Sequence, residues 1–192
     1  MKRISLILLA VFALTMTTSC KKDKKETKVE DQELSKEVPV KEVIKLQVAL
    51  EPKSDSKVKG NAVFTEEDGA VTMVVVLDGL TEGEHAIHLH EKADCSAADG
   101  TSSGGHWNPT NQPHGKWGSA DGYHKGDIGN LKADANGNAT ITMTTDEWCI
   151  GCGDANKDII GKAIIVHEGI DDFKTQPTGD AGGRISCGGI IQ

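Results

Sequence analysis

The chain has 192 residues and a formal net charge of −8, with 26% charged and only 4% aromatic residues. This length suits one domain with appendages, and the excess of acidic residues argues against nucleic acid as a partner. The 22 glycines and the scarcity of aromatic residues favour an all-β domain.

The first segment of the chain has the features of an export signal. Lys2 and Arg3 precede an apolar run that is too short to span a bilayer and that ends just before Cys20. A small residue directly before a cysteine resembles a bacterial lipoprotein cleavage site, so we expect removal of residues 1–19 and lipidation of Cys20. An ordinary soluble secreted product is the alternative, because Thr17 is less typical of such a site at its position.

Residues 20–42 form a charged stretch between this segment and the first strand. Lysines and acidic residues are dense along it and large apolar side chains are few, a composition that cannot bury enough surface to become ordered. We therefore predict a solvated tether that joins a lipid anchor to a domain at residues 43–192. Without residues 1–19, which contain two basic residues and no acid, the charge of the mature chain is −10.

Apolar and polar residues alternate along much of this domain with the period of two that is typical of half-buried β-strands. Consecutive strands with short turns predict an antiparallel sandwich or barrel, and no convincing helical period is present. The predicted strands cover residues 44–51, 57–65, 70–77, 84–91, 127–133, 139–145, 159–166 and 185–191. Two long loops remain between strands, at residues 92–125 and 168–184.

Two histidines alternate with apolar residues in the stretch 83–91, which reads G-E-H-A-I-H-L-H-E. In a β-strand this alternation places His88 and His90 on one face, with Ile87 and Leu89 on the core side. Imidazole nitrogens are favoured ligands of copper and zinc, and a strand holds two of them at a fixed separation. This strand is therefore a candidate part of a metal site.

The loop at residues 92–125 carries more candidate ligands. Loops of this length without regular structure are usually functional or disordered, and a bound metal would explain an ordered one. The loop contains His106, His114 and His124, and Asp127 follows His124 by three residues. That spacing lets a histidine and a carboxylate turn toward one ion.

Five motifs in this order resemble the copper/zinc superoxide dismutase family over residues 43–192. They read G-E-H-A-I-H-L-H, G-G-H-W-N-P, Y-H-K-G-D-I-G-N, I-I-V-H-E-G-I-D-D and T-G-D-A-G-G-R-I-S-C-G. Any one of them alone would be weak, but five in the right order are highly specific. The resemblance implies a flattened, sandwich-like, eight-stranded antiparallel Greek-key β-barrel whose two long loops form the active site.

The resemblance also implies two sets of metal ligands. Copper would be bound by His88, His90, His106 and His167, and zinc by His106, His114, His124 and Asp127. His106 would belong to both sets, with its deprotonated ring bridging the two ions. Donor chemistry agrees, because four nitrogens suit Cu(II), while three imidazoles and one carboxylate suit a closed tetrahedral zinc site. A structural zinc site alone is the alternative, but it would leave His88, His90 and His167 without a role.

Further residues take roles from the same resemblance. Arg184 matches an arginine that guides the anionic substrate, and the Gly-Gly before it lets the backbone fold close to a site. A solvated surface arginine is the alternative. Asp171 matches a carboxylate that bridges a copper histidine and a zinc histidine, here His88 and His114. Thr178 matches the residue on the other side of the access channel.

A seventh histidine and the cysteines complete the assignments. His85 matches a family histidine that lies near the site without binding metal, and we expect it to orient the ligand strand or loop. Five cysteines minus a lipidated Cys20 leave four, which allow three pairings. The resemblance selects a disulfide between Cys95 and Cys187, which would tie the first long loop to the last strand.

The other two cysteines, Cys149 and Cys152, lie in W-C-I-G-C-G-D, which the usual family pattern lacks. Three interpretations compete for this pair: a local disulfide that caps a loop insertion, a redox-active pair, and a copper-acceptance site of two thiolates. We favour the local disulfide.

The activity that the resemblance implies is dismutation of superoxide to oxygen and hydrogen peroxide by copper that cycles between Cu(II) and Cu(I), with His106 and Arg184 as catalytic residues. We expect the enzyme outside the cytoplasm, lipid-anchored through Cys20 to a bacterial membrane and facing the periplasm or the medium. Its state as monomer or homodimer is left open. The competing class is a non-catalytic copper carrier on the same barrel, which the loss of His106 or Arg184 would have favoured; both are present.

Overall fold

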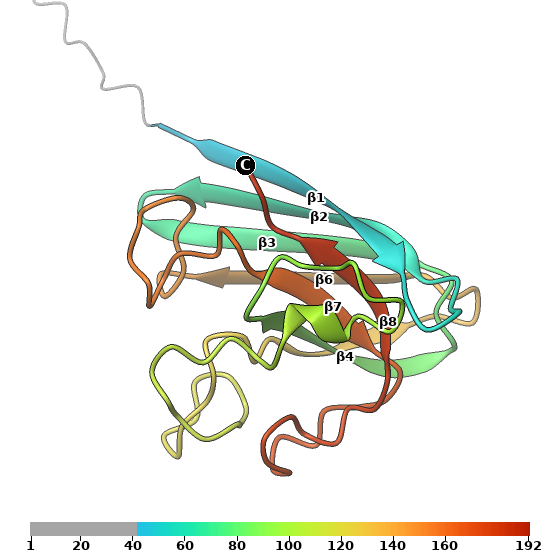
Figure 1. The fold of residues 1–192 in the computed structure, drawn as a ribbon. Helices are drawn as coiled ribbons and strands as arrows, with labels where there is room; N and C mark the ends of the chain where they lie inside the picture. Colours follow the sequence, from blue (N-terminus) through green and yellow to red (C-terminus); the bar gives the residue numbers. More distant parts are fainter. Residues whose placement is uncertain (1–41) are drawn as a thin grey trace, which may run out of the picture. The chain divides into compact units, whose positions relative to one another are not determined.

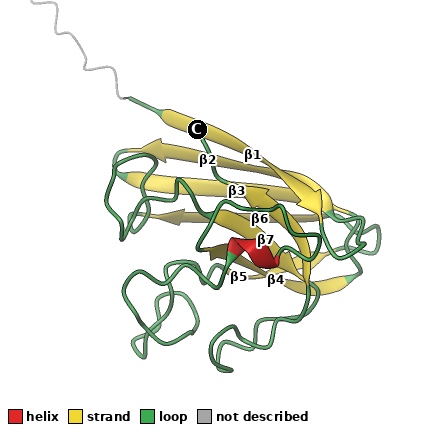
Figure 2. Cartoon of the chain, viewed as in Figure 1, coloured by secondary structure: helices red, strands yellow, loops and turns green. Residues whose placement is uncertain are grey.

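The computed structural model describes residues 42–192, so the predicted export signal, Cys20 and the predicted tether up to residue 41 lie outside the described residues. The described part contains eight strands and one turn of 3-10 helix (Figures 1 and 2). They are β1 (Ile44–Pro52), β2 (Lys59–Glu67), β3 (Ala70–Asp78), β4 (Gly83–His90), η1 (Thr101–Ser103), β5 (Gly129–Ala133), β6 (Ala139–Thr145), β7 (Ala163–His167) and β8 (Arg184–Gly189). No helix between residues 42 and 192 has the length and apolar character needed to cross a bilayer.

The strands form a closed antiparallel barrel in the order β1-β2-β3-β6-β5-β4-β7-β8. Pairing of Glu51 with Cys187 and of Pro52 with Ser186 joins β1 to β8 and closes the barrel. Because β3 pairs with β6, and β4 lies between β5 and β7, the chain crosses from one part of the barrel to the other as in a Greek key. The predicted eight-stranded all-β fold is confirmed.

The core follows from the alternation along the strands. On β3, Val71, Met73, Val75 and Leu77 point inward and are at most 2% exposed. Strand β4 differs, because both of its faces are buried from His85 onward. Ile87 and Leu89 enter the core cluster, while His88 and His90 are buried on the opposite face, in contact with residues of the long loops.

Hairpin turns use the residues that such turns require. Asp68 (φ 55°) and Gly69 (φ 78°) connect β2 to β3 as a two-residue turn in which both residues have positive φ. Between β5 and β6, Asp134 Oδ1 accepts hydrogen bonds from the backbone N–H groups of Asn136 and Asn138, each at 2.9 Å. The hairpin predicted between residues 133 and 139 is thereby closed.

Several strand boundaries differ from the prediction by one to four residues, and the starts of β7 and β5 show why. Strand β7 begins at Ala163 and includes His167, although the apolar run begins at Ile159. Ile159 is fully buried, yet it belongs to a turn in which the Asp158 carboxylate accepts the N–H of Ile160 at 3.0 Å. The predicted start at Ile159 is wrong because this residue is buried without pairing in a strand. Similarly, β5 begins two residues after Asp127, because the Asp127 N–H donates to the carbonyl of His124 in a turn.

Candidate metal centre

Neighbouring strands and one loop bring four histidines together. His88 and His90 lie on β4, which pairs with β7, and His167 is the last residue of β7. His106, from the first long loop, lies beside His90 because the two residues form an isolated β-bridge. All four residues are at most 4% exposed. The resulting group, called the first histidine group, has one ligand nitrogen per ring, all within 4.8 Å of one another.

In this group each ring makes a polar contact through one nitrogen, and its other nitrogen has no hydrogen-bond partner among the described residues. These buried, unpartnered nitrogens are Nδ1 of His88 and Nε2 of His90, His106 and His167. His90 Nδ1 donates to the carbonyl of Gly104 at 2.9 Å, and His167 Nδ1 donates to the carbonyl of Gly182 at 3.3 Å. A carbonyl can only accept, so the opposite Nε2 keeps its lone pair. Four such lone pairs suit a copper ion.

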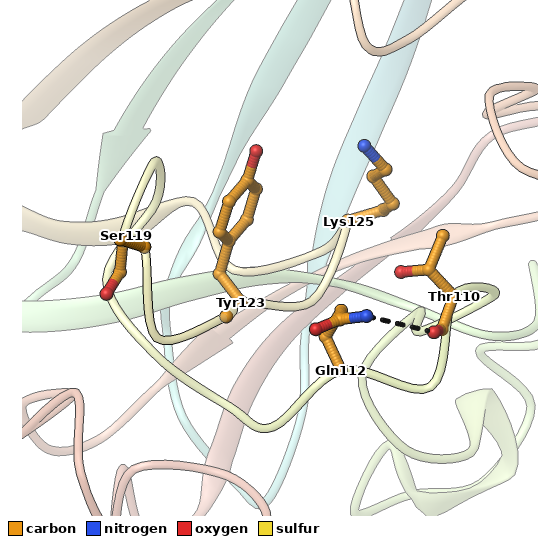
Figure 3. A pocket seen from close by; sticks show the side chains of 7 residues that line it. Thr110, Gln112, Ser119, Tyr123 and Lys125 are labelled. Atoms are coloured by element: carbon orange, nitrogen blue, oxygen red, sulfur yellow. Dashed lines mark hydrogen bonds between the residues drawn. The ribbon is translucent and has the colours of Figure 1, made fainter.

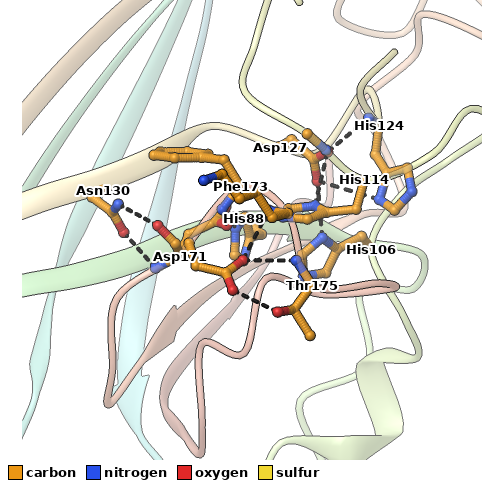
Figure 4. Close-up of polar contacts among 12 residues, drawn as sticks. His88, His106, His114, His124, Asp127, Asn130, Asp171, Phe173 and Thr175 are labelled. Atoms are coloured by element: carbon orange, nitrogen blue, oxygen red, sulfur yellow. Dashed lines mark hydrogen bonds and ion pairs between the residues drawn. The ribbon is translucent and has the colours of Figure 1, made fainter. Parts of the chain in front are cut away.

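The second group consists of His106, His114, His124 and Asp127, whose ligand atoms also lie within 4.8 Å of one another. Asp127 is fully buried at its centre (Figure 4). One of its oxygens lies 2.9 Å from Nδ1 of His106 and 3.3 Å from Nδ1 of His124, and the other lies 3.0 Å from Nδ1 of His114. Three imidazoles around one carboxylate form the donor set of a closed zinc site.

Asp171 joins the two groups through its carboxylate (Figure 4). Its Oδ2 lies 2.8 Å from Nε2 of His88, and its Oδ1 lies 2.9 Å from Nε2 of His114. The backbone N–H of Phe173 also donates to Oδ1 at 2.7 Å. Asn130 holds the backbone of Asp171 from β5, donating to its carbonyl and accepting from its N–H. The carboxylate therefore fixes which nitrogen of each ring faces a metal.

Burial favours the neutral form of three rings in the first group, those of His90, His106 and His167. It lowers the pKa of His106 to about 4, although a hydrogen bond to Asp127 opposes the shift. Burial, chiefly, lowers the pKa of His167 to about 3, and the hydrogen bond to the carbonyl of Gly182 opposes the shift. Burial likewise holds the pKa of His90 well below its ordinary value. Neutral imidazoles at pH 7 are the form that binds metal.

In the second group, His114 shows the opposite shift. Burial alone would lower the pKa of His114, but contacts with Asp127 and Asp171 outweigh it and raise the pKa to about 9. Burial opposes ionisation of both carboxyl groups, yet their histidine contacts hold the pKa of each well below its usual range. The site thus concentrates two buried negative charges, which a divalent cation would offset.

Arg184 lies at the start of β8, opposite His167 at the end of β7. Its Nη1 donates to the carbonyl of Gly100 at 2.8 Å and to the hydroxyl of Ser103 at 3.0 Å. The side chain is half-buried and held by the first long loop, so the alternative of a freely solvated arginine is excluded. Thr178, predicted to lie across the channel, is half-buried in the second long loop.

His85 belongs to neither group of ligands. Its Nδ1 lies 3.0 Å from the backbone carbonyl oxygen of His167, and its Nε2 lies 3.0 Å from the carbonyl oxygen and 3.2 Å from the hydroxyl of Thr81. Only 3% of the residue is exposed. It therefore ties β4 to the end of β7, and the orienting role remains a prediction.

Sequence reasoning missed Gln176, which clamps the backbone of His114. Its Oε1 accepts the N–H of His114 at 2.9 Å, and its Nε2 donates to the carbonyl of His114 at 2.8 Å. The two residues are separated by 62 positions, and an exposed glutamine in a loop carries no pattern that would reveal such a contact. This clamp joins the two long loops beside the second group.

Two further residues that sequence reasoning missed support the segment around His124. Trp148 Nε1 donates to the carbonyl of Lys125 at 2.9 Å, and Tyr123 donates from its hydroxyl to Glu147 at 2.6 Å. Lys125 forms an ion pair with the same carboxylate. The contacts hold both neighbours of His124 from the segment that follows β6.

A separate pocket of about 310 Å³ is lined in part by this segment (Figure 3). It is lined by Thr110, Gln112, Ser119, Ala120, Gly122, Tyr123 and Lys125. None of these residues belongs to either ligand group, so the pocket is distinct from the metal centre.

The structure contains two disulfides among its described residues. One joins Cys95 in the first long loop to Cys187 on β8, and the other joins Cys149 to Cys152 within the connection between β6 and β7. The first bridge holds the loop that carries Gly100, a partner of Arg184.

Comparison with known proteins agrees with this geometry. A family model described as copper/zinc superoxide dismutase matches residues 58–190. The chain is 40% identical over 144 residues to an extracellular superoxide dismutase (Cu-Zn) of Drosophila melanogaster, with 71% of this chain and 77% of that protein covered. It is 39% identical over 140 residues to a superoxide dismutase (Cu-Zn) of Caulobacter vibrioides, with coverage of 71% and 80%.

Solved structures give the same result. A SOD-like protein from Bacillus subtilis matches with a TM-score of 0.67 at 30% identity, over 76% of this chain and 97% of that chain. A double mutant of that protein, with two residues replaced by histidine, matches with a TM-score of 0.68 at 32% identity over the same shares. The chain therefore belongs to the copper/zinc superoxide dismutase family.

Proposed function

We propose that the protein dismutates superoxide, with copper held by the first histidine group and zinc held by the second. The observation that carries the proposal is the convergence of buried, unpartnered imidazole nitrogens in two groups that share His106. His106 directs Nε2 into the first group and Nδ1 toward Asp127 in the second. One ring can therefore face both ions through its two nitrogens.

Bound copper supplies the redox chemistry, since alternation between Cu(II) and Cu(I) can oxidise one superoxide to oxygen and reduce a second to hydrogen peroxide with the uptake of two protons. The residues of the chain orient the histidines that would hold the copper. The carbonyls of Gly104 and Gly182 orient His90 and His167, and Asp171 orients His88. Because these partners hold the rings in place before a metal binds, little reorganisation is needed on binding.

We assign to Arg184 the role of attracting the anionic substrate, superoxide. Its guanidinium is a permanent cation, held by Gly100 and Ser103 in a position opposite the His167 backbone. The chain carries a formal charge of −8, so attraction of an anion must come from local positive potential of this kind. Capture of superoxide should therefore depend on ionic strength.

We also propose that the enzyme acts outside the cytoplasm and is lipid-anchored through Cys20. Two disulfides suit an oxidising compartment, and the small residue directly before Cys20 resembles that of a lipoprotein cleavage site. Mass spectrometry of the N-terminal peptide of the membrane-associated protein tests this. A diacylglyceryl modification on Cys20 is expected, whereas an unmodified N-terminus at another residue would refute the anchor.

The main test measures metal content and superoxide dismutation on the same purified sample, before and after addition of copper. We expect about one copper and one zinc per chain, with fast turnover that cyanide inhibits. Full copper occupancy without turnover would refute the enzymatic function and support a copper carrier.

The role of Arg184 has its own test in a matched pair of variants. Arg184→Ala and Lys174→Ala each remove one positive charge, and Lys174 is exposed in the second long loop. We expect kcat/KM to fall about tenfold and to lose part of its salt dependence in Arg184→Ala only, because only this cation is held beside the histidines. Equal kinetics of the two variants would contradict the assignment.

A further inference from the structure

The Cys149–Cys152 disulfide lies between β6 and β7 and takes no part in either ligand group. Cys152 is exposed, while Cys149 is only 7% exposed. The Cys95–Cys187 disulfide is less accessible, because Cys187 is 1% exposed and Cys95 packs against the same small cluster of buried residues. A reagent in solvent can therefore approach the Cys152 sulfur, whereas the other bridge is shielded by the barrel.

The surroundings of Cys152 favour a thiolate at its sulfur. The backbone N–H of Asp154 donates to Cys152 Sγ at 3.4 Å. A sulfur that is released as a thiolate keeps this donor, and a backbone N–H stabilises negative charge more than it stabilises a neutral thiol.

The loop around this bridge has other means of holding its shape. The Asp158 carboxylate accepts hydrogen bonds from the N–H groups of Gly151, Gly153 and Ile160, at 2.9 to 3.0 Å. The Cys149 N–H donates to the carbonyl of Lys157 at 2.9 Å, and its carbonyl accepts from Ile159 at 3.1 Å. None of these hydrogen bonds passes through the sulfur atoms.

The loop is also anchored to the barrel. The Ile150 N–H donates to Glu66 Oε2 on β2 at 2.7 Å. Trp148, Ile150 and Ile159 are at most 3% exposed and belong to the main core cluster. Loss of the sulfur–sulfur bond therefore leaves the buried residues and the hydrogen bonds that position this loop.

We propose that Cys149–Cys152 is a thiol-exchange site for a dithiol, and that its opening leaves the barrel and the metal centre intact. A thiolate of the dithiol attacks Cys152 Sγ, the disulfide bond breaks, and Cys149 leaves as a thiolate that takes up a proton. The second thiol of the same molecule then attacks its own sulfur in the mixed disulfide and releases Cys152. The protein disulfide gains two electrons and two protons, and the dithiol is oxidised to a disulfide.

The test is a titration of the metal-loaded protein with dithiothreitol, followed by alkylation with iodoacetamide and peptide mass spectrometry. We expect Cys149 and Cys152 to become alkylated at a dithiothreitol concentration at least tenfold below that needed for Cys95 and Cys187. At that lower concentration the zinc content and the near-ultraviolet circular dichroism should be unchanged. Opening of both bridges at the same concentration, or of Cys95–Cys187 first, would overturn the proposal.

Two double variants keep the proposal testable without relying on selective reduction. The Cys149→Ser/Cys152→Ser variant should fold, bind zinc and show no alkylation at the lower dithiothreitol concentration. The Cys95→Ser/Cys187→Ser variant should still open its remaining bridge at that concentration. If the first variant loses its near-ultraviolet spectrum or its zinc, the bridge is needed for the fold and the proposal is wrong.

Discussion

Replacement of Gly179 with alanine would disturb the metal centre without touching a metal ligand. Gly179 has φ +70°, and an added Cβ would lie 2.0 Å from Oδ1 of Asp171 and 2.6 Å from Nε2 of His114. The carboxylate would have to move by more than about 1 Å to reach ordinary contact distance. It is held by His88, His114 and the N–H of Phe173 at 2.7 to 2.9 Å, so the movement breaks the hydrogen bond to His114.

The magnitude follows from the contacts that are lost. A buried hydrogen bond to a charged group contributes roughly 1.5–3 kcal/mol. Left-handed backbone strain on a residue with a Cβ adds about 1 kcal/mol. Loss of an outer partner of a metal-binding histidine lowers metal affinity by roughly 10–100-fold. We therefore expect Gly179→Ala to lower the free energy of unfolding by about 2–4 kcal/mol and zinc affinity by about 10–100-fold.

The matched control is Gly118→Ala, since Gly118 has φ +78° and an added Cβ would meet nothing within 4 Å. It has the backbone strain without the clash. Urea unfolding of the metal-free protein and competition with a chromophoric zinc chelator supply the two readouts. If Gly179→Ala binds zinc as tightly as Gly118→Ala, the reasoning about Asp171 is refuted.

Three more predictions concern the bridge to β8, the loop after β6 and the clamp on His114. Replacing Cys95 and Cys187 together with serine should lower the free energy of unfolding by roughly 4–5 kcal/mol, because the bridge closes a loop of 92 residues; a urea-measured loss below about 1 kcal/mol would contradict this. For Asp158, burial would raise the pKa of the carboxyl, but its backbone hydrogen bonds outweigh that effect and lower it. Its stabilisation is therefore present above the unfolded pKa of about 4 and is lost as pH falls through the folded value. Asp158→Asn should have a free energy of unfolding about 2 kcal/mol lower than the wild type at pH 7, and this difference should narrow below about pH 4. A difference that stays constant down to about pH 3 would argue against this role of Asp158. Gln176→Ala should weaken zinc binding about tenfold by removing both hydrogen bonds to the His114 backbone, and Gln176→Glu, which keeps only an acceptor, should fall between it and the wild type in chelator competition.

Local sequence patterns were sufficient where the structure is itself local. The alternation of His88 and His90 with Ile87 and Leu89 predicted two ligands on one face of a buried strand, and β4 has that arrangement. The period of two is a property of the extended backbone, so it can be read without knowing the partner strands. The same local logic failed at Ile159, where burial came from a turn that the Asp158 carboxylate closes.

Pairings within the metal centre needed more than local patterns. The resemblance of five motifs to a known family indicated which histidines belong together, and the structure places those residues in two buried groups. Neither source gave a reason to suspect Gln176 or Trp148. Each residue acts by hydrogen bonding to the backbone of a loop that is distant in the sequence, and such a contact produces no periodic pattern of residue types.

By itself, the sequence determined the all-β class, most strand positions and the chemical character of the ligands, because backbone period and donor type belong to residues and their near neighbours. Only the tertiary structure decided which nitrogen of each ring stays free and what holds Arg184. It also decided which disulfide faces solvent. These features depend on contacts such as Arg184 with Gly100, which are 84 residues apart. Barrel closure brings such distant segments together, so their partners cannot be inferred from either segment alone.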